Sequence, residues 1–98
     1  MTIRHEKNGS DLTIALEGRL DTTTAPALEA DLKESLVDVS TLTFDFAQLE
    51  YISSAGLRVL LAAQKQMNKQ GTMKIRHVSE VIMEIFEVTA FTDILTIE

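Results

Sequence analysis

Tyr51-Ile52-Ser53-Ser54-Ala55-Gly56-Leu57 marks the point where a strand pattern changes into a helix pattern. Before this stretch, residues 42–47 alternate between apolar and polar side chains, as a half-buried β-strand does. After it, apolar side chains recur at helical spacing over residues 55–69. We therefore expect Ser53 or Ser54 to be the N-cap of this helix, because a serine hydroxyl accepts a hydrogen bond from the free N–H groups of the first turn.

The two adjacent hydroxyls allow a structural and a functional interpretation. A helix N-terminus carries unpaired N–H groups and a partial positive charge, so it accommodates an anion such as a phosphate. Local chemistry alone favours a simple cap at Ser54, since serine caps are common. A phosphate-accepting serine remains the alternative at this position.

The N-terminal part of the chain predicts a β-hairpin followed by a helix. An Asn-Gly pair lies in the turn at residues 8–11, and residues 12–16 then alternate as a second strand. We expect Gly18 to end that strand. Leucines spaced four residues apart predict an amphipathic helix over about residues 24–38, with Pro26 in its first turn.

The C-terminal part continues the alternation of helices and strands. Gly71 is expected to end the helix at 55–69 as its C′ residue, and a strand should follow around residues 73–75. A short helix over residues 80–88 and a last short strand around 95–97 complete the pattern. Ser79 should cap the short helix. The side chains expected to face the core are Val81, Ile82, Ile85 and Phe86.

This order predicts one α/β domain over residues 1–98. Alternating strands and helices favour right-handed crossovers and a mixed, mostly parallel sheet of four to five strands, with the hairpin as an antiparallel edge. The expected core consists of Leu12, Ile14, Leu16, Phe44, Phe46, Leu57, Leu60, Leu61 and Ile75.

Composition excludes several classes of protein. With 45% apolar and 24% charged residues, the 98-residue chain is typical of a soluble globular protein. Its net charge of -6 argues against nucleic acid and anionic membranes as partners. The absence of cysteine excludes disulfides and thiolate metal sites. Since the sequence has no transmembrane stretch and no signal-peptide pattern, we expect a cytoplasmic protein without membrane insertion.

Catalysis is not expected at the serine pair. The hydrolase motif G-x-S-x-G is absent, because Ile52 and Gly56 flank Ser54 at the two glycine positions. His5 and His77 are the only histidines, and neither has the spacing of a metal-ligand set. The sequence predicts no catalytic residue, no metal and no cofactor.

Three segments together resemble the STAS domain, the fold of bacterial anti-sigma factor antagonists. They are Gly18-Arg19-Leu20-Asp21 with Thr24-Ala25, the stretch from Phe44 to Leu57, and Phe86 with Thr89-Ala90-Phe91 and Ile94. The resemblance covers nearly the whole chain, and its middle segment is the specific one.

The resemblance implies a phosphorylation switch. The phosphoacceptor of the family lies two residues before the loop glycine, which here is Gly56, so Ser54 is the expected site and Ser53 a secondary one. Well-known members often carry Asp where this chain has Ser53. Some members have lost the serine, so its presence favours the switched type.

The implied function is that of a binding module rather than an enzyme. It would bind a histidine-kinase-like serine kinase that acts as an anti-sigma factor, would be inactivated by phosphorylation, and would be restored by a serine phosphatase. Asp21 would contact the kinase or order the loop, or it would serve only as a turn and cap residue. The expected partner-binding residues are Asp21, Thr22, Ser53, Ser54, Ala55, Gly56, Leu57 and Arg58.

Two other functions remain as alternatives. Some STAS proteins are accessory subunits of ABC-type lipid transporters, but these commonly lack the loop serine that Ser54 provides. A nucleotide-binding sensor domain is the other alternative, since loops at the carboxyl ends of parallel strands often bind ligands. No phosphate-binding glycine loop supports that role.

Overall fold

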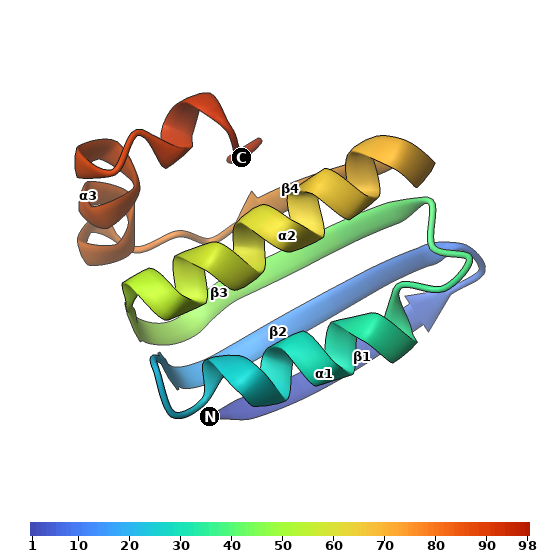
Figure 1. Ribbon diagram of the computed structural model, residues 1–98, viewed down its shortest axis with the longest axis horizontal. Helices are drawn as coiled ribbons and strands as arrows, with labels where there is room; N and C mark the ends of the chain where they lie inside the picture. Colours follow the sequence, from blue (N-terminus) through green and yellow to red (C-terminus); the bar gives the residue numbers. More distant parts are fainter.

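The computed structural model describes residues 1–98 as a single mixed sheet with three helices (Figure 1). Its elements are β1 (Thr2–Asn8), β2 (Asp11–Leu20), α1 (Ala25–Ser35), β3 (Thr41–Ile52), α2 (Ser54–Gln70), β4 (Thr72–Arg76), α3 (Glu80–Val88) and the 3-10 turn η1 (Phe91–Asp93). The strand order is β1-β2-β3-β4, antiparallel between β1 and β2 and parallel elsewhere. The predicted fold class and the antiparallel hairpin edge are confirmed.

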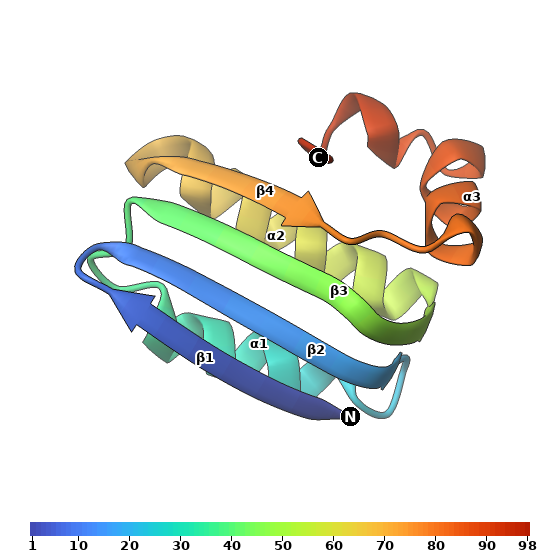
Figure 2. The same ribbon diagram turned by 180° about the vertical axis from the view of Figure 1, so that it is seen from behind.

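Helices α1 and α2 lie on one side of the sheet. In Figure 1, α1 and α2 cross the same face, and Figure 2 shows the opposite face without a covering helix. The partners of β4 on β3 run only from Thr41 to Asp45, so the second half of β3 extends past β4. Helix α3 packs against this part of β3, and the ring centre of Phe86 lies 6.4 Å from the ring centre of Phe46. No helix is long and apolar enough to cross a membrane.

The core lies between the sheet and the helices, and most of the predicted core is confirmed. Twenty-four buried apolar side chains form one cluster. Leu61 is an exception, because it is only half-buried. It follows the fully buried Leu60 by about 100° around α2, which turns it toward the edge of the interface. Val81 is 58% exposed, since α3 buries only Ile82 and Phe86, four residues apart.

Several predicted boundaries are wrong. Gly18 does not end β2: it has a φ of +94° beside an irregularity in the β2–β3 register, and the strand continues to Leu20. The expected last strand is reduced to an isolated parallel bridge between Ile75 and Ile97. Helix α1 is shorter than predicted, because Leu36 is already its C-cap.

Gly71 ends α2 as expected, but for a different reason. Its φ is 173°, which is extended backbone rather than the left-handed conformation of a C′ glycine. A Cβ at this position would overlap the backbone of Ser40. The glycine therefore lets the end of α2 lie directly against the backbone of Ser40. Next to it, the backbone N–H of Thr72 donates to Ser40 O at 2.9 Å.

Candidate functional site

The ends of β2 and β3 bring the predicted site together at one edge of the sheet. Leu20 and Ile52 are paired where these two parallel strands end. Just beyond them, the backbone N–H of Ser53 donates to the carbonyl of Leu20 at 2.9 Å. The loop into α1 and the start of α2 therefore lie side by side, as expected for the carboxyl ends of parallel strands.

The two serines have different structural roles. Ser53 is the N-cap of α2, and its half-buried hydroxyl accepts from the N–H of Gly56 at 3.4 Å. Ser54 is the first helical residue, is exposed, and its hydroxyl makes no hydrogen bond within the chain. The sequence allowed either serine as the cap, and local chemistry favoured a simple cap at Ser54. That interpretation of Ser54 is wrong, because the structure assigns the cap to Ser53.

Gly56 allows the start of α2 to lie directly on the strand ends. A Cβ at this position would lie 2.7 Å from Leu20 Cγ, 2.9 Å from Ile52 Cγ1 and 3.0 Å from Leu20 O. Both of these side chains are buried and have no free space to move into. Glycine at this position thus allows α2 to pack against the strand ends. The first residue of the helix, Ser54, remains on the surface.

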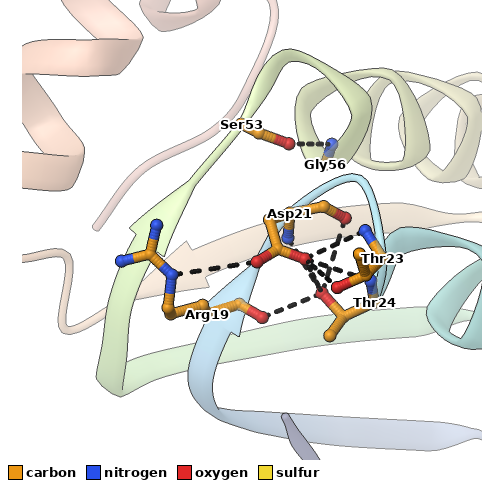
Figure 3. A network of polar contacts seen from close by, with 6 residues as sticks. All are labelled: Arg19, Asp21, Thr23, Thr24, Ser53 and Gly56. Carbon is orange, nitrogen blue, oxygen red and sulfur yellow. Dashed lines mark hydrogen bonds and ion pairs between the residues drawn. The ribbon is translucent and has the colours of Figure 1, made fainter.

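Asp21 holds the neighbouring loop in place (Figure 3). Its Oδ1 accepts from the N–H and the hydroxyl of Thr23 at 3.0 and 2.7 Å, and from the N–H of Thr24 at 3.2 Å. Its Oδ2 lies 3.8 Å from Arg19 Nε. The hydroxyl of Thr23, with the N–H groups of Thr24 and Thr23, keeps the pKa of Asp21 below its usual value, although desolvation opposes this shift. This geometry supports the loop-ordering role.

Thr24 holds the N-cap position of α1 without capping the helix through its side chain. Its hydroxyl instead donates to the carbonyl of Arg19 at 2.8 Å and accepts from the N–H of Asp21 at 2.8 Å. The guanidinium of Arg19 also lies 4.4 Å from the ring centre of Tyr51 on β3. These contacts fasten the end of β2 to the end of β3.

The predicted partner-binding residues differ in how much surface they offer. Thr22, Ser54 and Arg58 are exposed, and Asp21, Ser53 and Ala55 are half-buried. Gly56 is buried, and Leu57 is only 5% exposed, so these two residues offer little surface.

A surface hollow of about 360 Å³ adjoins Ser54, and we refer to it as the Ser54 hollow. It is lined by Ser54, Leu57 and Arg58 of α2 and by Thr89 and Phe91 of the C-terminal segment. Sequence reasoning did not include Thr89 and Phe91 in the site. Their only signal was their presence in the third segment of the family resemblance.

Neither histidine is bonded to a serine. His5 Nε2 lies 2.7 Å from Asp31 Oδ1, and His77 Nδ1 lies 3.0 Å from Asp45 Oδ1. No group of three or more histidine, aspartate or glutamate side chains is arranged to hold a metal ion. Neither imidazole therefore contacts the hydroxyl of Ser54.

The chain is similar to known proteins over nearly its whole length. The family model described as "Mlab, STAS domain" matches residues 3–96. A Bordetella bronchiseptica protein named as an anti-sigma factor antagonist, BtrV, is 33% identical over 100 residues, covering 99% of this chain and 85% of that protein. The anti-sigma-B factor antagonist of Bacillus subtilis is 28% identical over 93 residues, covering 94% and 85%.

Solved structures share the fold. An anti-sigma factor antagonist from Mycobacterium paratuberculosis has a TM-score of 0.88 at 22% identity, covering 98% of this chain and 83% of that one. The antagonist SpoIIAA in its unphosphorylated form has a TM-score of 0.85 at 17% identity, covering 99% and 88%. The phosphorylated form of Bacillus SpoIIAA has a TM-score of 0.77 at 17% identity, covering 99% and 91%.

Proposed function

Because this chain belongs to the STAS domain family of anti-sigma factor antagonists, we propose that it binds an anti-sigma factor and is switched off by phosphorylation of Ser54. The observation that carries the proposal is the separation of the two hydroxyls. Ser53 is occupied as the cap of α2, whereas Ser54 is exposed and unbonded. Of the two, only Ser54 is free to receive a phosphate without loss of a helix cap.

The switch works through charge at the contact surface. A phosphate adds about 1.5 to 2 negative charges and three acceptor oxygens. The N-terminus of α2 tolerates this charge, because the first N–H groups of the helix have no intrahelical acceptor. A partner surface that fits a neutral hydroxyl would have to desolvate it, at a cost on the order of several kcal/mol. Such a penalty weakens binding by about 10³-fold without a change of fold.

The partner would be a histidine-kinase-like serine kinase that is itself the anti-sigma factor, and a serine phosphatase would restore the active form. This chain would then act in the cytoplasm by binding, not by catalysis. The Asp21 loop would present Thr22 beside Ser54 on the same contact surface, because the two loops are joined at Leu20 and Ser53.

An accessory role on a lipid transporter is the second possibility for a STAS protein. Such a role requires no phosphate acceptor, and the exposed, unbonded Ser54 therefore favours the switch. Nucleotide binding receives no support from a glycine-rich phosphate loop.

Phosphorylation of the purified chain tests the proposal. Each histidine-kinase-like serine kinase encoded in the source genome is incubated with ATP and the wild type, Ser54→Ala or Ser53→Ala. Peptide mass spectrometry should find one phosphate on Ser54 of the wild type and of Ser53→Ala, and none on Ser54→Ala. Ser53→Ala is the matched control, since it removes a neighbouring hydroxyl at a stability cost of about 0.5–2 kcal/mol.

Binding to the same kinase tests the switch itself. Ser54→Ala should retain affinity, and Ser54→Asp should weaken it less than phosphate does, because a carboxylate carries one charge and fewer acceptors. Equal affinity of the phosphorylated and unmodified chains would refute the switch. Phosphate found only on Ser53 would refute the residue assignment.

A further inference from the structure

The C-terminal segment, which borders Ser54 through Thr89 and Phe91, carries several exposed apolar side chains. The chain has five large apolar residues that are exposed: Met1, Val37, Val81, Val88 and Ile94. Three of these five lie between the start of α3 and the residue after η1. Both ribbon views place α3 near the N-terminal end of α2 (Figures 1 and 2). None of these three side chains lines the Ser54 hollow, which the C-terminal segment reaches through Thr89 and Phe91.

A left-handed residue shapes this part of the chain. Ala90, between α3 and η1, has φ +62° and ψ +19°, a conformation that is uncommon for a residue other than glycine. The turn lies between Thr89 and Phe91, which both line the Ser54 hollow. Strained backbone of this kind is concentrated at functional surfaces, where the surrounding structure holds it.

Arg58 supplies a charge that the chain itself does not neutralise. Of the four arginines, Arg4, Arg19 and Arg76 form ion pairs within the chain, and Arg58 forms none. It is exposed and faces the Ser54 hollow beside Leu57, which is 5% exposed. An arginine at the edge of an apolar depression is suited to a carboxylate that lies next to an apolar side chain.

We propose that the Ser54 hollow is the docking pocket for the kinase partner, and this inference rests on the proposed function. An apolar side chain of the partner contacts Leu57 and Phe91, and a neighbouring carboxylate pairs with Arg58. The occupant is acidic and apolar because the hollow combines an unpaired cation with an apolar lining. The partner surface thereby extends from α2 to α3 and η1.

The pocket also connects binding to the switch. Ser54 and Arg58 are four residues apart on α2, so their side chains lie on the same helix face. A phosphate on Ser54 enters the same hollow and pairs with the Arg58 guanidinium in place of the partner's carboxylate. Phosphorylation then blocks the pocket and neutralises its charge in one step.

The test measures affinity for the kinase that phosphorylates Ser54, with the unphosphorylated chain. Arg58→Glu and Phe91→Ala should each weaken binding by about tenfold or more, as central interface residues do. Arg58 is exposed, so Arg58→Glu should leave the fold intact, and urea unfolding checks Phe91→Ala. Val37→Ala is the matched control, since Val37 is 60% exposed but does not line the hollow, and its affinity should stay within about twofold of wild type.

The outcomes separate the two proposals. If either Arg58→Glu or Phe91→Ala binds within about twofold of wild type while phosphorylation of Ser54 still abolishes binding, the pocket is wrong and the switch stands. If no kinase binds the wild type, both proposals are wrong. Reduced affinity in both variants, with normal affinity in Val37→Ala, supports the pocket.

Discussion

Gly56→Ala should destabilise the chain, although alanine is the better helix former. Alanine favours a helix over glycine by up to about 1 kcal/mol. Its Cβ, however, would lie 2.7 Å from Leu20 Cγ and 2.9 Å from Ile52 Cγ1, well inside the optimal carbon separation of about 3.5–4.0 Å. Overpacking of this kind costs about 1–3 kcal/mol. The upper part of that range applies, because the Leu20 carbonyl is a third close contact and is anchored by Ser53 N–H.

The overlap therefore outweighs the helix propensity, and we expect a net loss of about 1–2 kcal/mol of unfolding free energy. The melting temperature should fall by roughly 5–15 °C in a domain of this size. Urea unfolding followed by circular dichroism measures the loss. Ala62→Gly, at an exposed position of the same helix, measures propensity alone and should cost about 1 kcal/mol. A Gly56→Ala protein at least as stable as wild type would contradict the close seating of α2 on the strand ends.

Three further predictions concern the core and the loops. Leu60→Ala should cost about 2–5 kcal/mol in urea unfolding, and the half-buried Leu61→Ala clearly less; equal losses would mean that the buried face of α2 is misassigned. Gly71→Ala should cost about 3 kcal/mol or leave the chain unfolded, since its Cβ overlaps the backbone of Ser40; a near-neutral effect would contradict that approach. Asp21→Asn should reduce stability at neutral pH. Because the hydroxyl of Thr23 and nearby N–H groups lower the pKa of Asp21 in the folded chain, its carboxylate stabilises the fold above the usual value of 3.8, and this contribution disappears as the pH falls through the lowered pKa. The difference between wild type and Asp21→Asn in pH-dependent unfolding should therefore shrink in that acidic range, and a difference that grows there would be inconsistent with the lowered pKa.

Local patterns were sufficient where neighbouring residues alone decide the structure. The alternation at residues 42–47 and the leucine spacing in α1 predicted element types, because period 2 and period 3.6 each bury one face. The boundary at Gly18 failed for the opposite reason. A glycine signals backbone freedom, and the sequence does not say whether that freedom is used for a strand end or, as here, for a positive φ within a continuing strand.

The sequence by itself determined the mixed α/β fold, the hairpin edge and the serine pair at the start of α2, because these follow from periodicity, turn chemistry and a specific local motif. Only the tertiary structure decided which serine is the cap, since both hydroxyls suit that position. Ser53 lies at the strand end, where its N–H donates to Leu20 O, and its hydroxyl accepts from Gly56 N–H. It also brought Phe91 beside Arg58. That proximity depends on the packing of α3 against β3 and on the turn at Ala90, and interactions between distant segments leave no periodic signal in the chain.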